Sequence, residues 1–137
     1  MSNLSQHPKY SEDQILRYLE HIGLPQPGSF SLSSIKDEIA TDPLQWLTKL
    51  QRRQMARVPF ENLALHYSTN HSVILEREFL FDKIVVRGKG GYCMENNLFF
   101  ATVLRTLGYT VLSGGARVSK AVTLGQVDGS YTGLYAP

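Results

Sequence analysis

The chain has 137 residues, of which 42% are hydrophobic and 19% are charged, and its formal net charge is +2. This composition is typical of a globular domain and excludes a disordered tail or a low-complexity chain. The net charge is too small for an electrostatic nucleic-acid binder. The basic cluster Arg52, Arg53 and Arg57 has the spacing of a solvated helix face. We therefore expect no nucleic-acid partner.

The apolar runs and the cysteine content bear on where the protein works. The sequence has no run of about 18 apolar residues, so we expect no membrane span. Its first residues lack the charged-then-apolar order of a secretory signal. A single cysteine, Cys93, cannot form an internal disulfide, which favours a cytoplasmic location. It also excludes a Cys₂His₂ zinc site, and we predict no metal centre.

The first half of the chain carries helix start and stop signals. Ser11 begins a capping box, so a helix is expected to follow it and to stop at Gly23. Asp42 directly before Pro43 predicts the start of another helix. That helix should end at Val58, because a residue that precedes a proline avoids the helical conformation.

The second half of the chain has a different residue pattern. After a glycine-rich turn, an apolar run from Cys93 to Leu107 predicts a helix that is buried on all sides and stopped by Gly108. Before the glycine-rich turn, the apolar core of 72–81 suggests a short strand, and 82–86 a further helical turn. After the helix, strands are expected at 109–112 and 116–118, and a tight turn at 127–130 between later strands.

The candidate chemistry lies at the glycine-rich turn. Gly90 and Gly91 place Cys93 at a helix N-terminus, where unpaired N–H groups and the helix dipole stabilise a thiolate. The same N–H groups can hold an oxyanion during acyl transfer, and glycines let the backbone fold sharply and a substrate come close. A small buried structural cysteine is the alternative. The glycines favour catalysis, because a merely structural helix start prefers Ser, Thr, Asp or Asn.

Two motifs together resemble a known family. Val-Pro-Phe-Glu-Asn-Leu at 58–63, followed by Gly-Gly-Tyr-Cys-Met-Glu-Asn-Asn at 90–97, is similar to motifs of the arylamine N-acetyltransferases. The likeness extends over about residues 10–112. It implies transfer of an acyl group from acyl-CoA to an aromatic amine or hydrazine through a cysteine thioester, with no bound cofactor. The acyl group, whether acetyl, propionyl or malonyl, stays open.

The resemblance also implies a fold. These enzymes have an α+β, papain-like architecture in which a helical bundle precedes a β-barrel. Applied to this chain, residues 1–86 would form the helical bundle domain. Residues 87–137 would form the nucleophile-bearing helix and the first strands of an incomplete β-barrel.

Site residues are carried over position by position. Cys93 matches the nucleophile. Phe60 matches an aromatic residue that lines the acceptor pocket, with an ordinary core phenylalanine as the alternative. Glu61 matches a carboxylate that pairs in the family with an arginine four residues before the cysteine. That position holds Lys89 here, so we expect Glu61 to pair with Lys89 or with Arg87.

The chain departs from the family in its triad. The family places a histidine and then an aspartate after the cysteine. Here Asp128 reads as a turn residue, and all four histidines precede Cys93: His7, His21, His66 and His71. We expect the chain to be an N-terminal part of the enzyme that ends before these residues and is inactive alone. Two alternatives stay open: a cysteine hydrolase of papain or transglutaminase type, and a non-catalytic truncated product.

Overall fold

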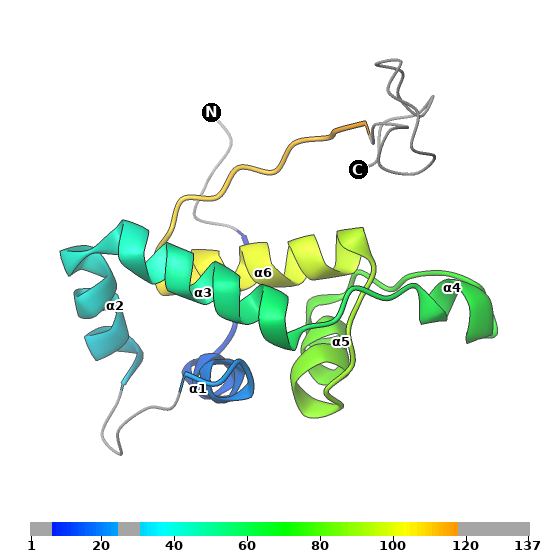
Figure 1. Ribbon diagram of the computed structural model, residues 1–137, viewed down its shortest axis with the longest axis horizontal. Coiled ribbons are helices and arrows are strands. Elements are labelled where there is room, and N and C mark those ends of the chain that lie inside the picture. Colours follow the sequence, from blue (N-terminus) through cyan, green and yellow to red (C-terminus); the bar gives the residue numbers. More distant parts are fainter. Residues whose placement is uncertain (1–6, 25–30, 118–137) are drawn as a thin grey trace.

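A computed structural model describes residues 7–24 and 31–117, in which helices pack together, α4 projects to one side and an extended segment follows α6 (Figure 1). A bundle is what the sequence leads us to expect for the first domain, but the described residues contain no β-strand, so the beginning of a barrel is not seen. The elements are α1 (Glu12–His21), α2 (Leu32–Thr41), α3 (Pro43–Arg57), α4 (Leu63–Tyr67), α5 (Arg77–Phe81), the π-helical turn η2 (Asp82–Val86) and α6 (Cys93–Leu107).

Local capping signals set the helix boundaries, as predicted. The hydroxyl of Ser11 accepts a hydrogen bond from the N3 amide of α1, and Gly23 follows this helix with a φ of 73°. Asp42 caps α3 by accepting from the backbone N–H of Gln45 at 3.0 Å. The helix ends at Arg57, directly before the Val-Pro step. These two predicted helices are confirmed.

Helix α6 begins at Cys93 and ends at Leu107, and Gly108 follows in the left-handed conformation, as predicted. Its burial is one-sided, however. Phe99 is fully buried against the other helices, whereas Met94, Leu98 and their neighbours are only half-buried. The expectation of burial on all sides is wrong for the described residues. Helices α2 and α5 pack against α6, whereas another face of α6 borders a hollow that is also lined by Leu75 and residues 111–114.

An aromatic cluster forms the centre of the core. The Tyr10 ring lies 5.4 Å from that of Phe81 and 5.7 Å from that of Phe99, and the Tyr18 ring meets Phe99 edge-on at 5.5 Å. The Tyr18 hydroxyl reaches the buried side chain of Gln54 at 3.0 Å. These contacts join α1, α3, α5 and α6, so the nucleophile helix has a rigid support at its buried face.

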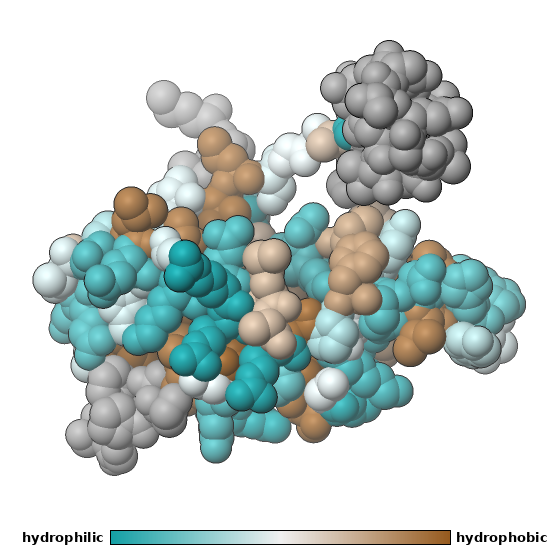
Figure 2. All heavy atoms as spheres, in the orientation of Figure 1, coloured by the Kyte–Doolittle hydropathy of each residue, from teal (hydrophilic) through white to brown (hydrophobic). Residues whose placement is uncertain are grey.

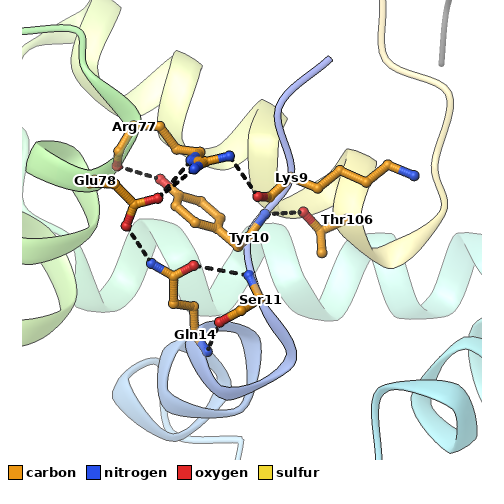
Figure 3. Close-up of polar contacts among 7 residues, drawn as sticks. All are labelled: Lys9, Tyr10, Ser11, Gln14, Arg77, Glu78 and Thr106. Atoms are coloured by element: carbon orange, nitrogen blue, oxygen red, sulfur yellow. Dashed lines mark hydrogen bonds and ion pairs between the residues drawn. The ribbon is translucent and has the colours of Figure 1, made fainter. Parts of the chain in front are cut away.

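A short N-terminal strap, residues 9 and 10, ties α5 to α6 (Figure 3). The amide of Tyr10 donates to the Thr106 hydroxyl at 3.0 Å, and the Tyr10 hydroxyl donates to the carbonyl of Arg77 at 3.1 Å. Arg77 in turn donates to the carbonyl of Lys9 at 2.8 Å. The strap thereby fixes the C-terminal half of α6 relative to α5.

Several strand predictions are wrong. Segment 72–76 has no regular structure, since the described part offers it no strand to pair with, and 77–81 is helix α5. Leu80, Phe81 and Ile84 are buried together, which is the spacing of one helix face that continues into η2. The helical turn expected at 82–86 is present as η2. Residues 109–112 form no strand in the described part. Ala116 makes a single bridge, and residues from 118 onward, including the predicted turn at 127–130, lie outside the described residues.

The outward side of α3 is hydrophilic (Figure 2). Arg52, Arg53 and Arg57 are all exposed there, which confirms that this basic cluster is a solvated helix face. No helix in residues 7–24 and 31–117 is long and apolar enough to cross a membrane. The same residues contain no group of three His, Cys, Asp or Glu side chains placed to hold a metal ion.

Candidate active site

The two sequence motifs are in direct backbone contact. The N–H of Gly91 donates to the carbonyl of Pro59 at 3.1 Å, and the N–H of Glu61 donates to the carbonyl of Gly91 at 3.0 Å. These bonds form a parallel bridge between Phe60 and Gly91. The segment that follows α3 therefore lies against the turn that precedes Cys93.

The glycines of this turn are required by close packing. A Cβ atom at Gly90 would overlap the carbonyl oxygen of Pro59. A Cβ atom at Gly91 would lie 2.8 Å from Oδ1 of Asn96 and 2.9 Å from Cβ of Glu95, closer than real Cβ atoms approach. Neither glycine is among the described residues with a positive φ. The reason for the glycine pair is thus contact between chain segments, a role that the sequence analysis did not identify.

Cys93 is the first residue of α6 and carries a free, half-buried thiol. Glu95 sits at the third position of the helix, and its Oε2 accepts from the N–H of Tyr92 at 2.8 Å. Asn96 donates from its side chain to the carbonyl of Gly91 at 2.9 Å. The turn and the first helical turn are thereby held in one geometry, with the cysteine between them.

A hollow of about 450 Å³ lies along the half-buried face of α6. Its walls include Met94, Asn97 and Leu98 from the first turns of the helix, together with Val111 and Leu112 from the extended segment. Cys93 is not among the described wall residues. From the glycine turn and the apolar helix we also predict that the Cys93 sulfur lies in a cleft between the helices and the first strands. The described residues do not test this prediction. A larger hollow of about 630 Å³ borders α3 and contains none of the motif residues.

A buried ion cluster joins the two motifs to η2. Nζ of Lys83 lies 2.8 Å from Oε1 of Glu95 and 3.1 Å from Oε1 of Glu61. The three side chains are 8%, 1% and 16% exposed, in that order. The second oxygen of Glu61 accepts from the N–H of Leu63 at 2.6 Å. Both carboxylates therefore share one ammonium group, and each is also bonded to a backbone N–H.

The prediction that Glu61 pairs with Lys89 or Arg87 is wrong, because Lys83 takes that place. The N–H of Lys89 donates to the carbonyl of Lys83 at 3.0 Å, so the chain folds back over η2 and Lys89 itself is exposed. Arg87 pairs with Asp82 at 2.7 Å on the surface. A π-helical turn places its residues out of the ordinary α-helical register, and here Lys83 is the residue that points inward.

The electrostatics of Lys83 are a balance of two effects. Burial acts to lower the pKa of Lys83, since it disfavours the charged ammonium. The hydrogen bonds and charges of Glu95 and Glu61 outweigh burial and raise that pKa above its ordinary value. Lys83 is therefore an ammonium ion at neutral pH.

Phe60 is 68% exposed in this structure, so it is not a core residue of the described helices. Its ring lies 5.6 Å from that of Tyr92, directly before the cysteine. The bridge to Gly91 sets this position. An aromatic pair thus stands next to the nucleophile turn.

The histidines lie elsewhere. Nδ1 of His71 is 3.0 Å from the carbonyl oxygen of Leu65, and the ring of His66 is 6.4 Å from that of Tyr67. His21 is on α1, and burial together with the Arg57 charge lowers its pKa. No histidine within 7–24 and 31–117, His7 included, hydrogen-bonds Cys93. The predicted turn residue Asp128 is outside the described part.

Two residues of the site were missed by the sequence reasoning. Lys83 gave no motif signal, since it follows Asp82 between two short apolar runs. Glu95 belongs to the second motif, but its place three residues after Tyr92 is also the N3 position of a helix that begins at Cys93, where an acid can cap the helix. A lysine between apolar runs and an acid at N3 are the features that would have indicated a buried pair.

A family model described as N-acetyltransferase matches residues 43–127, which include both motifs. The chain belongs to the arylamine N-acetyltransferase family. Among similar members of this family, N-malonyltransferase FDB2 of Fusarium pseudograminearum is 42% identical over 120 residues, which are 85% of this chain and 35% of that protein.

Other members of the arylamine N-acetyltransferase family are similar over shorter stretches. The pineal gland isozyme NAT-10 of Gallus gallus, named an arylamine N-acetyltransferase, is 37% identical over 89 residues, 65% of this chain and 30% of that protein. Arylamine N-acetyltransferase 1 of Oryctolagus cuniculus is 38% identical over 73 residues, 53% of this chain and 24% of that protein. The chain thus spans about a third or less of the length of these relatives.

Proposed function

We propose that this chain carries the nucleophile of an N-acyltransferase, which moves an acyl group from acyl-CoA to an aromatic amine. The observation that carries the proposal is the backbone bridge between Phe60 and Gly91. It brings both family motifs to the start of α6, where Cys93 has a free thiol. Membership of the acyltransferase family supports the same reaction class.

The reaction that we propose proceeds in two halves. The Cys93 thiolate attacks the thioester carbonyl of acyl-CoA, the carbon–sulfur bond to CoA breaks, and CoA leaves and takes up a proton. The amine nitrogen then attacks the acyl-cysteine, the bond to Sγ breaks, and the amine loses a proton as the thiolate returns. N–H groups of the first turn, which an α-helix leaves without intrahelical partners, are placed to stabilise the oxyanion. No histidine of the described residues hydrogen-bonds Cys93, so the scheme assigns the role of base to none of His7, His21, His66 and His71.

The substrate classes follow from the relatives and from the aromatic pair. Similar proteins are named as N-malonyltransferases and as arylamine N-acetyltransferases, so malonyl-CoA and acetyl-CoA are the two donors to compare. The exposed ring of Phe60 beside Tyr92 supports an aromatic acceptor, which could stack on it.

The test is acylation of the chain in a single turnover. The protein is incubated with malonyl-CoA or acetyl-CoA, and the adduct is located by peptide mass spectrometry, with Cys93→Ser as the control. We expect an adduct on the Cys93 peptide that aniline removes faster than water does. Loss of the adduct at one rate with and without aniline would indicate a hydrolase. No adduct from either donor would indicate a non-catalytic product.

A further inference from the structure

The start of α6 presents an electrostatic problem. A carboxylate near the first turn of a helix is favourable for the helix dipole, but it opposes a thiolate in the same turn. Glu95 is two residues from Cys93 and 1% exposed, so water does not screen its charge effectively. Lys83 is the cation that contacts this carboxylate, at 2.8 Å.

We propose that Lys83 is a positioning residue for Cys93: its single ammonium group pairs with both Glu95 and Glu61, and so fixes the nucleophile turn and offsets part of the negative charge that would oppose the thiolate. The effect on the thiolate rests on the proposed function, in which Cys93 is the nucleophile. The contacts of Lys83 with Glu95 and Glu61 do not depend on that function. One ammonium group connects η2, the segment after Pro59 and the first turn of α6.

Few other charges face this turn in the described structure. Glu95 comes from α6, Glu61 from the segment before α4, and Lys83 from η2. Lys89 is exposed in the turn itself, and the Arg87 side chain is paired with Asp82. The cluster of one lysine and two glutamates has a net charge of −1, and single substitutions change that charge in known steps.

The experiment measures how fast iodoacetamide alkylates Cys93 as a function of pH. The chain has one cysteine, so the signal comes from one site. Rates are corrected for the folded fraction by urea unfolding at each pH. Lys83→Met removes the ammonium group and leaves the two carboxylates without their common partner. We expect it to move the pH midpoint of alkylation upward by about 0.5 unit or more.

Three further variants give opposite or null results if charge is the cause. Glu95→Gln keeps an acceptor for the Tyr92 amide and should move the midpoint downward. The double variant K83M/E95Q restores the net charge of −1 and should return the midpoint toward the original value. Lys83→Arg keeps the positive charge, so its pH midpoint of alkylation should equal that of the unchanged chain. A matched control is Lys36→Met on α2, where the described structure shows no ion pair.

The proposal is overturned if the midpoints of K83M and E95Q both equal those of the unchanged chain and of K36M, or if K83R behaves as K83M does. Where K83M does not fold, E95Q and K83R decide the question alone. Failure of the proposed function is a separate result: the unchanged chain would form no acyl adduct with either CoA donor, while the alkylation profiles keep their order.

Discussion

The carbonyl oxygen of Pro59 occupies the space that the side chain of any residue other than glycine would need at position 90. This contact sits beside the bridge between Phe60 and Gly91, so the segment after α3 and the nucleophile turn fit together only when position 90 has no Cβ. The overlap is with backbone, which cannot move aside as a flexible side chain can. The fit is therefore sensitive to a single methyl group.

Gly90→Ala should destabilise the protein by about 1–3 kcal/mol, because overpacking forces the two segments apart. The measurement is urea unfolding followed by circular dichroism. Gly114→Ala is the matched control, since nothing lies within 4 Å of a Cβ at that position. Equal stability of the two variants would contradict the packing account of the glycine.

Glu61→Gln should lower the free energy of unfolding by about 1–3 kcal/mol. The change removes one charge partner of Lys83 in a pair that is largely buried, 8% and 16% exposed. Asp82→Asn breaks an ion pair with Arg87 whose side chains are 52% and 41% exposed, and it should cost less than about 1 kcal/mol. Urea unfolding of both variants in parallel gives the comparison. A larger cost for D82N would contradict it.

Thr106→Val tests the N-terminal strap. Valine has nearly the shape of threonine but leaves the buried amide of Tyr10 without its acceptor, so we expect a loss of about 1–3 kcal/mol. Hydrogen exchange at the Tyr10 amide should accelerate as well. Thr48→Val, at an exposed site of α3 where the hydroxyl bonds only the carbonyl of Leu44, should change stability little. Unchanged exchange at Tyr10 in T106V would show that the strap is held by other contacts.

The lowered pKa of His21 predicts that the free energy of unfolding falls in acid. Burial first, and the charge of Arg57 second, lower the pKa of His21 below its ordinary value of 6.5. The unfolded chain therefore binds a proton more readily than the folded one, so the contribution is present above pH 6.5 and is lost as the pH falls through the folded-state pKa. As the pH falls below 6.5, the free energy of unfolding should fall less steeply for His21→Gln than for the unchanged chain. His66→Gln, at an exposed position, should keep the original slope.

Helix boundaries could be predicted because their signals are local. Ser11, Asp42 and Gly108 each act on backbone groups within a few residues, so sequence spacing contains the information. The strand expected at 72–81 is wrong: its second half is helix α5, and 72–76 has no partner strand in the described part of the chain. Local propensity alone cannot supply that pairing.

The two motifs of the site could be identified from the sequence, but its ion pairs could not, and the role of Cys93 as nucleophile stays a prediction. The partner of Glu61 is decided by which residue of η2 faces inward, and this depends on a π-helical register that no short motif specifies. The role of Gly91 was likewise hidden, since the side chains that crowd it belong to the next helical turn. Contacts of this kind depend on the assembled tertiary structure.

The Phe60–Gly91 bridge also has a consequence for the order of folding. It closes a loop of about thirty residues, and the chain loses conformational entropy in closing this loop before the contacts of the bridge can stabilise it. Helices α3 and α6 are set by neighbouring residues and should form early, whereas the turn before Cys93 acquires its shape only when the distant segment arrives. A nascent chain would therefore form its helices first and fix the turn before the free Cys93 last.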